Sequence, residues 1–433
     1  MRTRTTPTAL APLRVQPFRL LLAGRVTSFL GNAVAPIALA FAVLDLTGSV
    51  SALGVIVGVR SAAQVLMLLF GGVLADRLPR PVVLVGSSVL SGLTQAAVAA
   101  LVLSGADTVA WLLALSLLNG ALSGLAFPAS AAIVPQTVPE RIRQQANALM
   151  RLGTNGILII GAALGGALVA AVGPGWGLGV DAASFLVAAG FFALVRVADV
   201  RETAAATSGT VPPVNERDPL ASGTVTPASG TWADLRAGWS AFTAQRWVWV
   251  VVASFGVINA CITGGVQVLG PAVADATIGR SAWGLVLAAE TAGAVAGGLI
   301  ALRLRVRRLL LFGMVCVLPE SLLLFGLAVL PVFGVLAALA VIQGIAIEQF
   351  GIAWDTSLQE HVPPAYLARV YSYDALGSFI AIPVGEVAVG PIAAHVGTTG
   401  TLLAAGIVII LAACAALSVR DVRTLVHDPP PVD

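Results

Sequence analysis

Long apolar runs alternate with short polar segments along almost the whole chain. Each run is close to the length of about 20 residues at which an α-helix spans the hydrocarbon core of a membrane. The runs are continuously apolar and do not alternate in segments of about ten residues, as the strands of a membrane barrel do. They therefore predict twelve transmembrane helices, at residues 19–45, 50–74, 82–104, 108–133, 145–171, 177–197, 247–270, 282–302, 308–330, 332–356, 368–394 and 398–419.

Composition supports this interpretation. Of the 433 residues, 58% are hydrophobic and 10% are charged, whereas a water-soluble domain carries about a quarter charged residues. The mean hydropathy is +0.95. The predicted fold class is therefore an all-α membrane protein, and the 46 glycines suit close packing of helices in lipid.

The basic side chains, all of them arginine, concentrate in alternate loops. Twenty of the 24 lie in or beside the two terminal segments and the loops after every second predicted helix, whereas Arg280 alone lies in a loop on the opposite side. Cytoplasmic loops carry an excess of arginine. We therefore expect a multi-pass protein of a bacterial inner membrane with both termini in the cytoplasm. The net charge of +3 then reflects topology and not nucleic-acid binding.

The chain divides into two similar halves. Residues 199–231 are rich in Thr, Ser, Pro and Gly, which is typical of a flexible linker. Residues 133–149 and 357–376 resemble each other, and paired glycines recur near the ends of the second and eighth runs. We predict two pseudo-symmetric six-helix bundles, 1–198 and 246–433, joined by a linker at 199–245 that ends in a short amphipathic helix containing Trp232, Leu235, Trp239 and Phe242.

Motifs that carry enzyme chemistry are not evident in the sequence. The three histidines lie at helix ends or in the C-terminal tail, and the three cysteines lie in predicted spans without a metal-ligand spacing. There is no nucleophile elbow and no phosphate-binding loop. We expect no enzymatic activity, no cofactor and no metal.

The polar loop between the second and third runs resembles a motif of the major facilitator superfamily of transporters. The pattern of Gly, Asp and Arg is carried by Gly72, Asp76, Arg77 and Arg80, although Pro79 stands where the last arginine is usually preceded by glycine. The stretches 18–34, 147–153, 180–186 and 362–372 are similar to the bacterial drug and siderophore efflux branch. The resemblance implies a twelve-helix monomer, with this loop acting as a cytoplasmic latch between the two halves.

Two further features bear on whether transport would be coupled to protons. The fifth run contains Gly161, Gly165 and Gly166 in a pattern that resembles the antiporter signature, with Ala162 in place of its proline. In the first run, Asn32 stands where many efflux relatives carry an acid.

Ionisable side chains within the runs are costly in lipid and are therefore functional candidates. In the arrangement that the resemblance implies, the tenth helix lines the cavity, so Glu348, whose protonated form burial favours, is the first candidate for binding a proton or a cationic substrate. Glu290 and Arg60 follow, on helices expected at the central interface. A structural pair between these two, or with Glu386, is an equally open interpretation.

The remaining intramembrane charges are given structural interpretations. Asp181 is expected to cap or orient the outer end of the sixth helix, and Glu320, after Pro319 in the peripheral ninth helix, is expected to be structural. Arg25, Arg151 and Asp374 lie near the cytoplasmic ends of their helices, where snorkelling or pairing between the halves explains them.

The function that these features predict is secondary active export of small amphipathic compounds across the lipid bilayer in exchange for protons. Uptake of a nutrient, or uniport without protons, is the alternative that Asn32 and Ala162 favour. A transporter-like receptor or lipid scramblase is a third hypothesis.

The arginine distribution makes a topological prediction. Reporter domains fused within residues 199–231 or after Arg423 should report the cytoplasm, and a fusion between residues 270 and 282 should report the opposite side, because arginine-rich loops are retained inside. Termini on opposite sides of the membrane, or a different number of crossings, would contradict it.

Overall fold

The computed structural model describes residues 10–75, 80–195, 239–240 and 242–426. These residues are almost entirely helical, and they contain twelve helical segments long and apolar enough to cross a membrane. The predicted fold class is confirmed. Of the predicted linker, residues 199–238 and 241 lie outside the described ranges, as do Asp76 and Arg77 of the loop motif.

The N-terminal bundle contains six long helices. Helix α1 packs against α5 and α6, α2 against α4, and α3 against α4 and α6. The helices are α1 (Gln16–Thr47), α2 (Val50–Ala75), α3 (Arg80–Ser104), α4 (Val109–Thr137), α5 (Arg143–Val172) and α6 (Pro174–Ala193), with short 3₁₀ helices η1 (Ala11–Arg14) and η2 (Glu140–Ile142) before α1 and α5.

The C-terminal bundle contains the other six spans. Helix α11 packs against α14, α9 against α15 and α17, and α13 against α17. The elements are α9 (Arg246–Ile262), the π-helical turn η3 (Thr263–Leu269), α10 (Gly270–Ala276), α11 (Arg280–Ala301), α12 (Leu309–Cys316), the 3₁₀ turn η4 (Leu318–Glu320), α13 (Ser321–Val329), α14 (Phe333–His361), α15 (Pro364–Phe379), α16 (Ile382–Val396), α17 (Thr398–Ser418) and α18 (Arg420–Thr424).

Three of these spans are interrupted, whereas the sequence predicted continuous helices. The seventh changes to π-helical geometry at η3, the ninth is broken at η4 and the eleventh is broken between α15 and α16. A proline stands in the first turn of α10, of η4 and of α16: Pro271, Pro319 and Pro383 respectively. Proline has no backbone N–H and cannot continue the hydrogen-bond ladder of the preceding turn.

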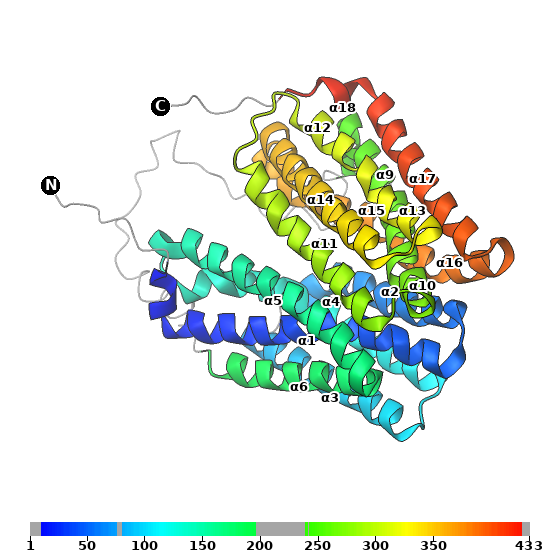
Figure 1. The fold of residues 1–433 in the computed structure, drawn as a ribbon. Helices are drawn as coiled ribbons and strands as arrows, with labels where there is room; N and C mark the ends of the chain where they lie inside the picture. Colours follow the sequence, from blue (N-terminus) through cyan, green and yellow to red (C-terminus); the bar gives the residue numbers. More distant parts are fainter. Residues whose placement is uncertain (1–9, 76–79, 196–238, 241, 427–433) are drawn as a thin grey trace, which may run out of the picture.

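At one end of the molecule, where α5 ends and α11 begins, the two bundles contact each other through glycines. We call this end the Arg280 end. A Cβ atom placed on Gly166 would lie 2.7 Å from the Cα of Gly284, so the two backbones are in contact. Helices α2 and α16 also meet closely, at Gly54 and Gly390. Figure 1 shows the N-terminal bundle, blue to green, and the C-terminal bundle, green-yellow to red, close together at this end and diverging from it.

Part of the predicted amphipathic helix is described. Trp239 and Phe242 stack with ring centroids 5.7 Å apart, and both contact the ring of Tyr373 in α15. These contacts attach the segment before α9 to the C-terminal bundle.

The close approach at Gly284 makes a packing prediction. In Gly284→Ala, the new Cβ would lie 2.5 Å from the carbonyl oxygen of Ala162. The Arg280 end should therefore close less tightly, and the closed conformation should be destabilised by about 1–3 kcal/mol. Distances between spin labels at Leu46 and Thr277, one on each bundle, would lengthen. Gly156→Ala in α5, which meets no other atoms within 4 Å, is the matched control and should leave them unchanged.

Candidate functional site

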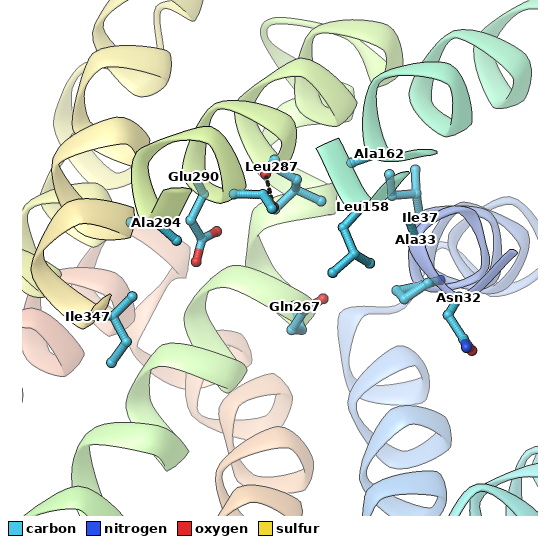
Figure 2. A pocket seen from close by; sticks show the side chains of 13 residues that line it. Asn32, Ala33, Ile37, Leu158, Ala162, Gln267, Leu287, Glu290, Ala294 and Ile347 are labelled. Atoms are coloured by element: carbon cyan, nitrogen blue, oxygen red, sulfur yellow. Dashed lines mark hydrogen bonds between the residues drawn. The ribbon is translucent and has the colours of Figure 1, made fainter. Parts of the chain in front are cut away.

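A cavity of about 310 Å³ lies between the two bundles, near the middle of the helices that line it. Its walls come from α1 and α5 of the N-terminal bundle and from η3, α11 and α14 of the C-terminal bundle (Figure 2). Most of the lining is apolar, for example Ile37, Leu158, Leu287 and Ile347. The polar side chains on its walls are Asn32, Gln267, Glu290 and Thr291.

Glu290 brings a carboxylate to the cavity wall. The side chain extends from α11 into the space beside Gln267, with Asn32 on the far side (Figure 2). The amide nitrogen of Gln343, in α14, lies 3.5 Å from its Oε1. An isolated carboxylate on an apolar wall attracts a proton or a cation.

The structure places Glu348 elsewhere. It is half-buried, and it lies on α14 against Gly297 and Gly298 of α11. The residues of α14 that line the described cavity are Gly344 and Ile347, and Glu348 lies one helical turn after Gly344, on the face that packs against α11. The sequence therefore identified the helix, but Glu348 is not among the residues that line this cavity.

Arg60 and Glu386 form a second polar cluster, where α2 of one bundle meets α16 of the other. The Ser61 hydroxyl donates a hydrogen bond to the Glu386 carboxylate, and the Arg60 guanidinium interacts electrostatically with Glu386 and with Asp181. Glu386 is 3% exposed. Of the pairings left open by the sequence, the structure brings Arg60 and Glu386 together across the halves and places Glu290 apart from them.

Asp181 does not cap its helix, in contrast to the prediction that it caps or orients the outer end. Helix α6 begins at Pro174, and its N-cap residue Gly173 makes no side-chain cap hydrogen bond. Asp181 lies inside the helix, fully buried, and its carboxylate accepts a hydrogen bond from Gln95 of α3. Its partners therefore come from other helices, α3 and α2.

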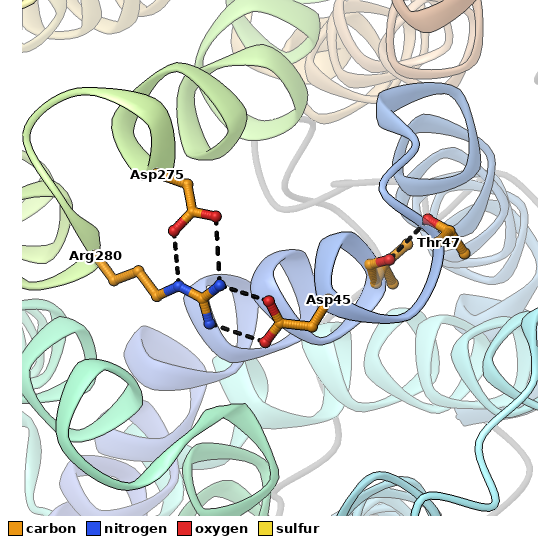
Figure 3. A network of polar contacts seen from close by, with 5 residues as sticks. Asp45, Thr47, Asp275 and Arg280 are labelled. Atoms are coloured by element: carbon orange, nitrogen blue, oxygen red, sulfur yellow. Dashed lines mark hydrogen bonds and ion pairs between the residues drawn. The ribbon is translucent and has the colours of Figure 1, made fainter.

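An ion pair joins the two bundles at the Arg280 end (Figure 3). The Nη1 atom of Arg280 donates to the Oδ2 atom of Asp45, at the end of α1, over 2.8 Å, and its Nε atom donates to Asp275, in α10, over 2.8 Å. The guanidinium also lies over the ring of Phe41, 4.7 Å from its centroid. The sequence did not predict this contact. Its only signal was that Arg280 is the one arginine in a loop predicted to lie opposite the arginine-rich loops.

The three glycines of the antiporter-like motif make close helix contacts. Gly161 and Gly165 face Ala33 and Val34 of α1, within the N-terminal bundle, whereas Gly166 faces α11 across the halves. Ala162 lines the cavity. Of the loop motif, Gly72 and Arg80 lie near the ends of α2 and α3, on either side of the undescribed residues 76–79.

Metal chemistry finds no support in the part of the chain that the structure describes. No three His, Cys, Asp or Glu side chains in those ranges gather closely enough to hold a metal ion. What the site can do is enclose a small molecule and offer it one carboxylate.

Comparison with known proteins identifies relatives of the whole fold. The sequence model of the family described as Major Facilitator Superfamily matches residues 21–319. No curated protein matches the chain.

Three of the solved structures that resemble the chain are all transporters. The nucleoside transporter NupG is 13% identical, with a TM-score of 0.72, and the match covers 93% of this chain and 98% of that one. A bacterial homologue of the human lysosomal transporter Spinster, inward-facing and unoccupied, is 16% identical with a TM-score of 0.66 over 96% and 97% of the two chains. A POT family transporter in complex with a thioalcohol conjugated peptide is 15% identical with a TM-score of 0.64 over 92% and 94%. At these identities the likeness is one of fold.

The ion pair in Figure 3 makes a prediction with an internal control. Asp45→Asn should open the Arg280 end, because it removes the carboxylate that holds the other bundle. The pair is partly exposed, so we expect the equilibrium between the closed and open conformations of this end to shift by about 1 kcal/mol or less, which is a few-fold in population. High salt should produce the same shift in the unaltered protein, because it screens the pair. Label distances across this end would measure it.

Asp275→Asn is the control. It removes a carboxylate from the same guanidinium, but Asp275 and Arg280 belong to one bundle. An equal opening in both variants would show that the contact between the halves is not what closes this end.

Proposed function

Because the chain belongs to the major facilitator superfamily of membrane transporters, we propose that it is a secondary active exporter that exchanges small amphipathic compounds for protons by alternating access. The single observation that carries this proposal is the cavity between the bundles, apolar on most of its wall and bearing the Glu290 carboxylate. An apolar body with one cationic group is the ligand that such a wall complements.

The shape of the molecule fits an alternating-access cycle. The bundles contact each other closely at the Arg280 end and diverge from it (Figure 1). If the arginine-rich loops lie in the cytoplasm, the Arg280 end is the outer end, and this conformation is inward-facing. Both termini then lie on the inner side of a bacterial plasma membrane. Rocking about the cavity would break the contacts of Arg280 and bring the opposite ends together.

Glu290 is the group that we assign to proton coupling. Among the residues proposed from the sequence, Glu290 and Asn32 lie on the cavity wall, and of these two only Glu290 titrates. Each charge moved through about 100 mV supplies about 2.3 kcal/mol, enough for a concentration ratio of tens. We assign the pair of Arg60 and Glu386 to the contact between the halves, with a secondary part in coupling, and rank Glu348 below Glu290.

The two motifs keep the roles that their resemblance implies. We propose that Gly72, Asp76, Arg77 and Arg80 form a cytoplasmic latch that closes when the outer end opens. Gly161, Gly165 and Gly166 allow α5 to slide on α1 and on α11, because small residues let helix backbones approach. No interface with a second copy is required by the cavity, and we propose a monomer.

Uptake of a nutrient, or uniport without protons, is the second candidate. Asn32 favours it, because an uncharged amide occupies the wall of α1 where proton-coupled efflux proteins carry an acid. An amide donates and accepts hydrogen bonds, which suits a neutral polar substrate.

The proposal is tested by ethidium, a lipophilic cation, in cells that lack their own efflux pumps. Expression should lower ethidium accumulation severalfold, and a protonophore should abolish the effect. Glu290→Gln should abolish it as well, because losing one coupled charge removes a driving force of about 2.3 kcal/mol per 100 mV, or roughly tens in concentration ratio.

Glu348→Gln is the comparison variant, since it removes a carboxyl from α14 beside the cavity wall and should retain efflux. Other lipophilic cations and neutral amphipaths would extend the screen. Net uptake of a probe, or efflux that does not change with the pH gradient, would favour the second candidate over the first.

A further inference from the structure

Glu320 is buried in the C-terminal bundle in an environment that does not stabilise its charge. It ends η4, the 3₁₀ turn that interrupts the ninth span, and it is 1% exposed. Both of its carboxylate oxygens are buried, and neither accepts a hydrogen bond from any residue in the described ranges. The hydroxyl of the next residue, Ser321, donates to the carbonyl oxygen of Leu318 instead. The structural role expected from the sequence would require a partner, and the described part of the chain provides none.

The ionisable groups around Glu320 do not compensate its charge. Its electrostatic neighbours are the Glu290 carboxylate and the Cys316 thiol, and neither is a cation. Helix α13 carries no titratable side chain, and α17 carries only Cys414. Helix α14, which also packs against η4, carries four charged or titratable residues, none of them a lysine or arginine: Glu348, Asp355, Glu360 and His361.

An ionised carboxylate in this position would be an unsolvated charge beside a second carboxylate. Both the loss of hydration and the repulsion from Glu290 disfavour the anion, whereas the neutral acid needs only one acceptor for its proton. The geometry therefore fits a proton on Glu320 better than a charge.

Glu290 differs from Glu320 in one respect that matters for exchange. It borders the cavity (Figure 2), where solvent and substrate arrive, and the amide nitrogen of Gln343 in α14 lies 3.5 Å from its Oε1 atom. Glu290 is the carboxylate among the described residues whose charge acts on Glu320. It is therefore the acid to which a proton leaving Glu320 can pass, and from Glu290 the proton can reach the cavity. In each transfer one O–H bond breaks and another forms, with no change in oxidation state.

We propose that Glu320 is a buried proton-binding site and that Glu290 is the carboxylate through which it exchanges protons with the cavity. The role of Glu320 in transport rests on the proposed proton coupling, whereas the presence of a proton on Glu320 does not. Together the two acids form a coupled pair that holds one proton more readily than none or two. A cationic group entering the cavity would offset the negative charge of Glu290, reduce its repulsion of an ionised Glu320, and so favour release of that proton.

Infrared spectroscopy of the purified full-length protein in lipid nanodiscs tests the site without measuring transport. The C=O stretch of a protonated carboxyl should be present at neutral pH and should be lost in Glu320→Gln, which is isosteric with the neutral acid and should fold. In Glu290→Gln, the hydrogen–deuterium exchange of this band should slow roughly 100-fold, the scale on which a positioned side chain speeds proton transfer. Glu348→Gln should leave both the band and its exchange unchanged.

The outcomes separate this inference from the proposed function. If the spectra of Glu320→Gln and the unaltered protein are the same, or if exchange is unaffected by Glu290→Gln, the buried site is overturned even when ethidium efflux is proton-coupled. If the band behaves as expected but no probe moves with protons, the buried site stands and the proposed function fails.

Discussion

A charged side chain within a membrane must be paired, hydrated or protonated, and this requirement organises the interior of the protein. Asp374 accepts hydrogen bonds from Trp354 and Ser378, and Arg60 interacts with two acids. Glu290 borders the cavity. Each of these groups lies where helices meet or where water can enter, and this location provides the partners or the water that reduce the cost of its charge. Glu320 has none of these except protonation, which is why its position is informative.

The second organising feature is the uneven contact between the bundles. At the Arg280 end the helices meet through glycines, so their backbones touch, and an ion pair and a cation–π contact add polar attachments. Toward the middle, larger side chains such as Leu158 and Ile347 hold the helices apart around the cavity. A contact that is strong at one end and replaced by a cavity further along allows two rigid bundles to rock with little change inside either of them.

The polar groups of the interface fall into two classes with different consequences for transport. Arg280, Asp45, Arg60 and Glu386 bridge the halves, so they contribute to the relative stability of conformations. Glu290 and Glu320 both belong to the C-terminal bundle and can change their protonation without breaking a contact between the halves. Coupling requires that these two classes influence each other, and the cavity between them is where a bound substrate touches both bundles.

The sequence by itself determined the membrane-spanning class and the number of spans, because these follow from the length and hydropathy of each segment, which do not depend on its neighbours. The division into two halves followed from the composition of residues 199–231 and from the similarity of residues 133–149 and 357–376. The sequence also limited the functional candidates to a handful of ionisable residues. It could not decide which of them meet. The sequence placed Glu348 ahead of Glu290, and only the packing of α11 against α14 shows that Glu290 borders the cavity whereas Glu348 lies against Gly297 and Gly298. The attachment of Asp181 to Gln95 and the pairing of Asp45 with an arginine 235 residues away are likewise tertiary decisions. Each depends on which distant helix supplies a hydrogen bond or a charge, and a linear pattern of apolar residues carries no information about that.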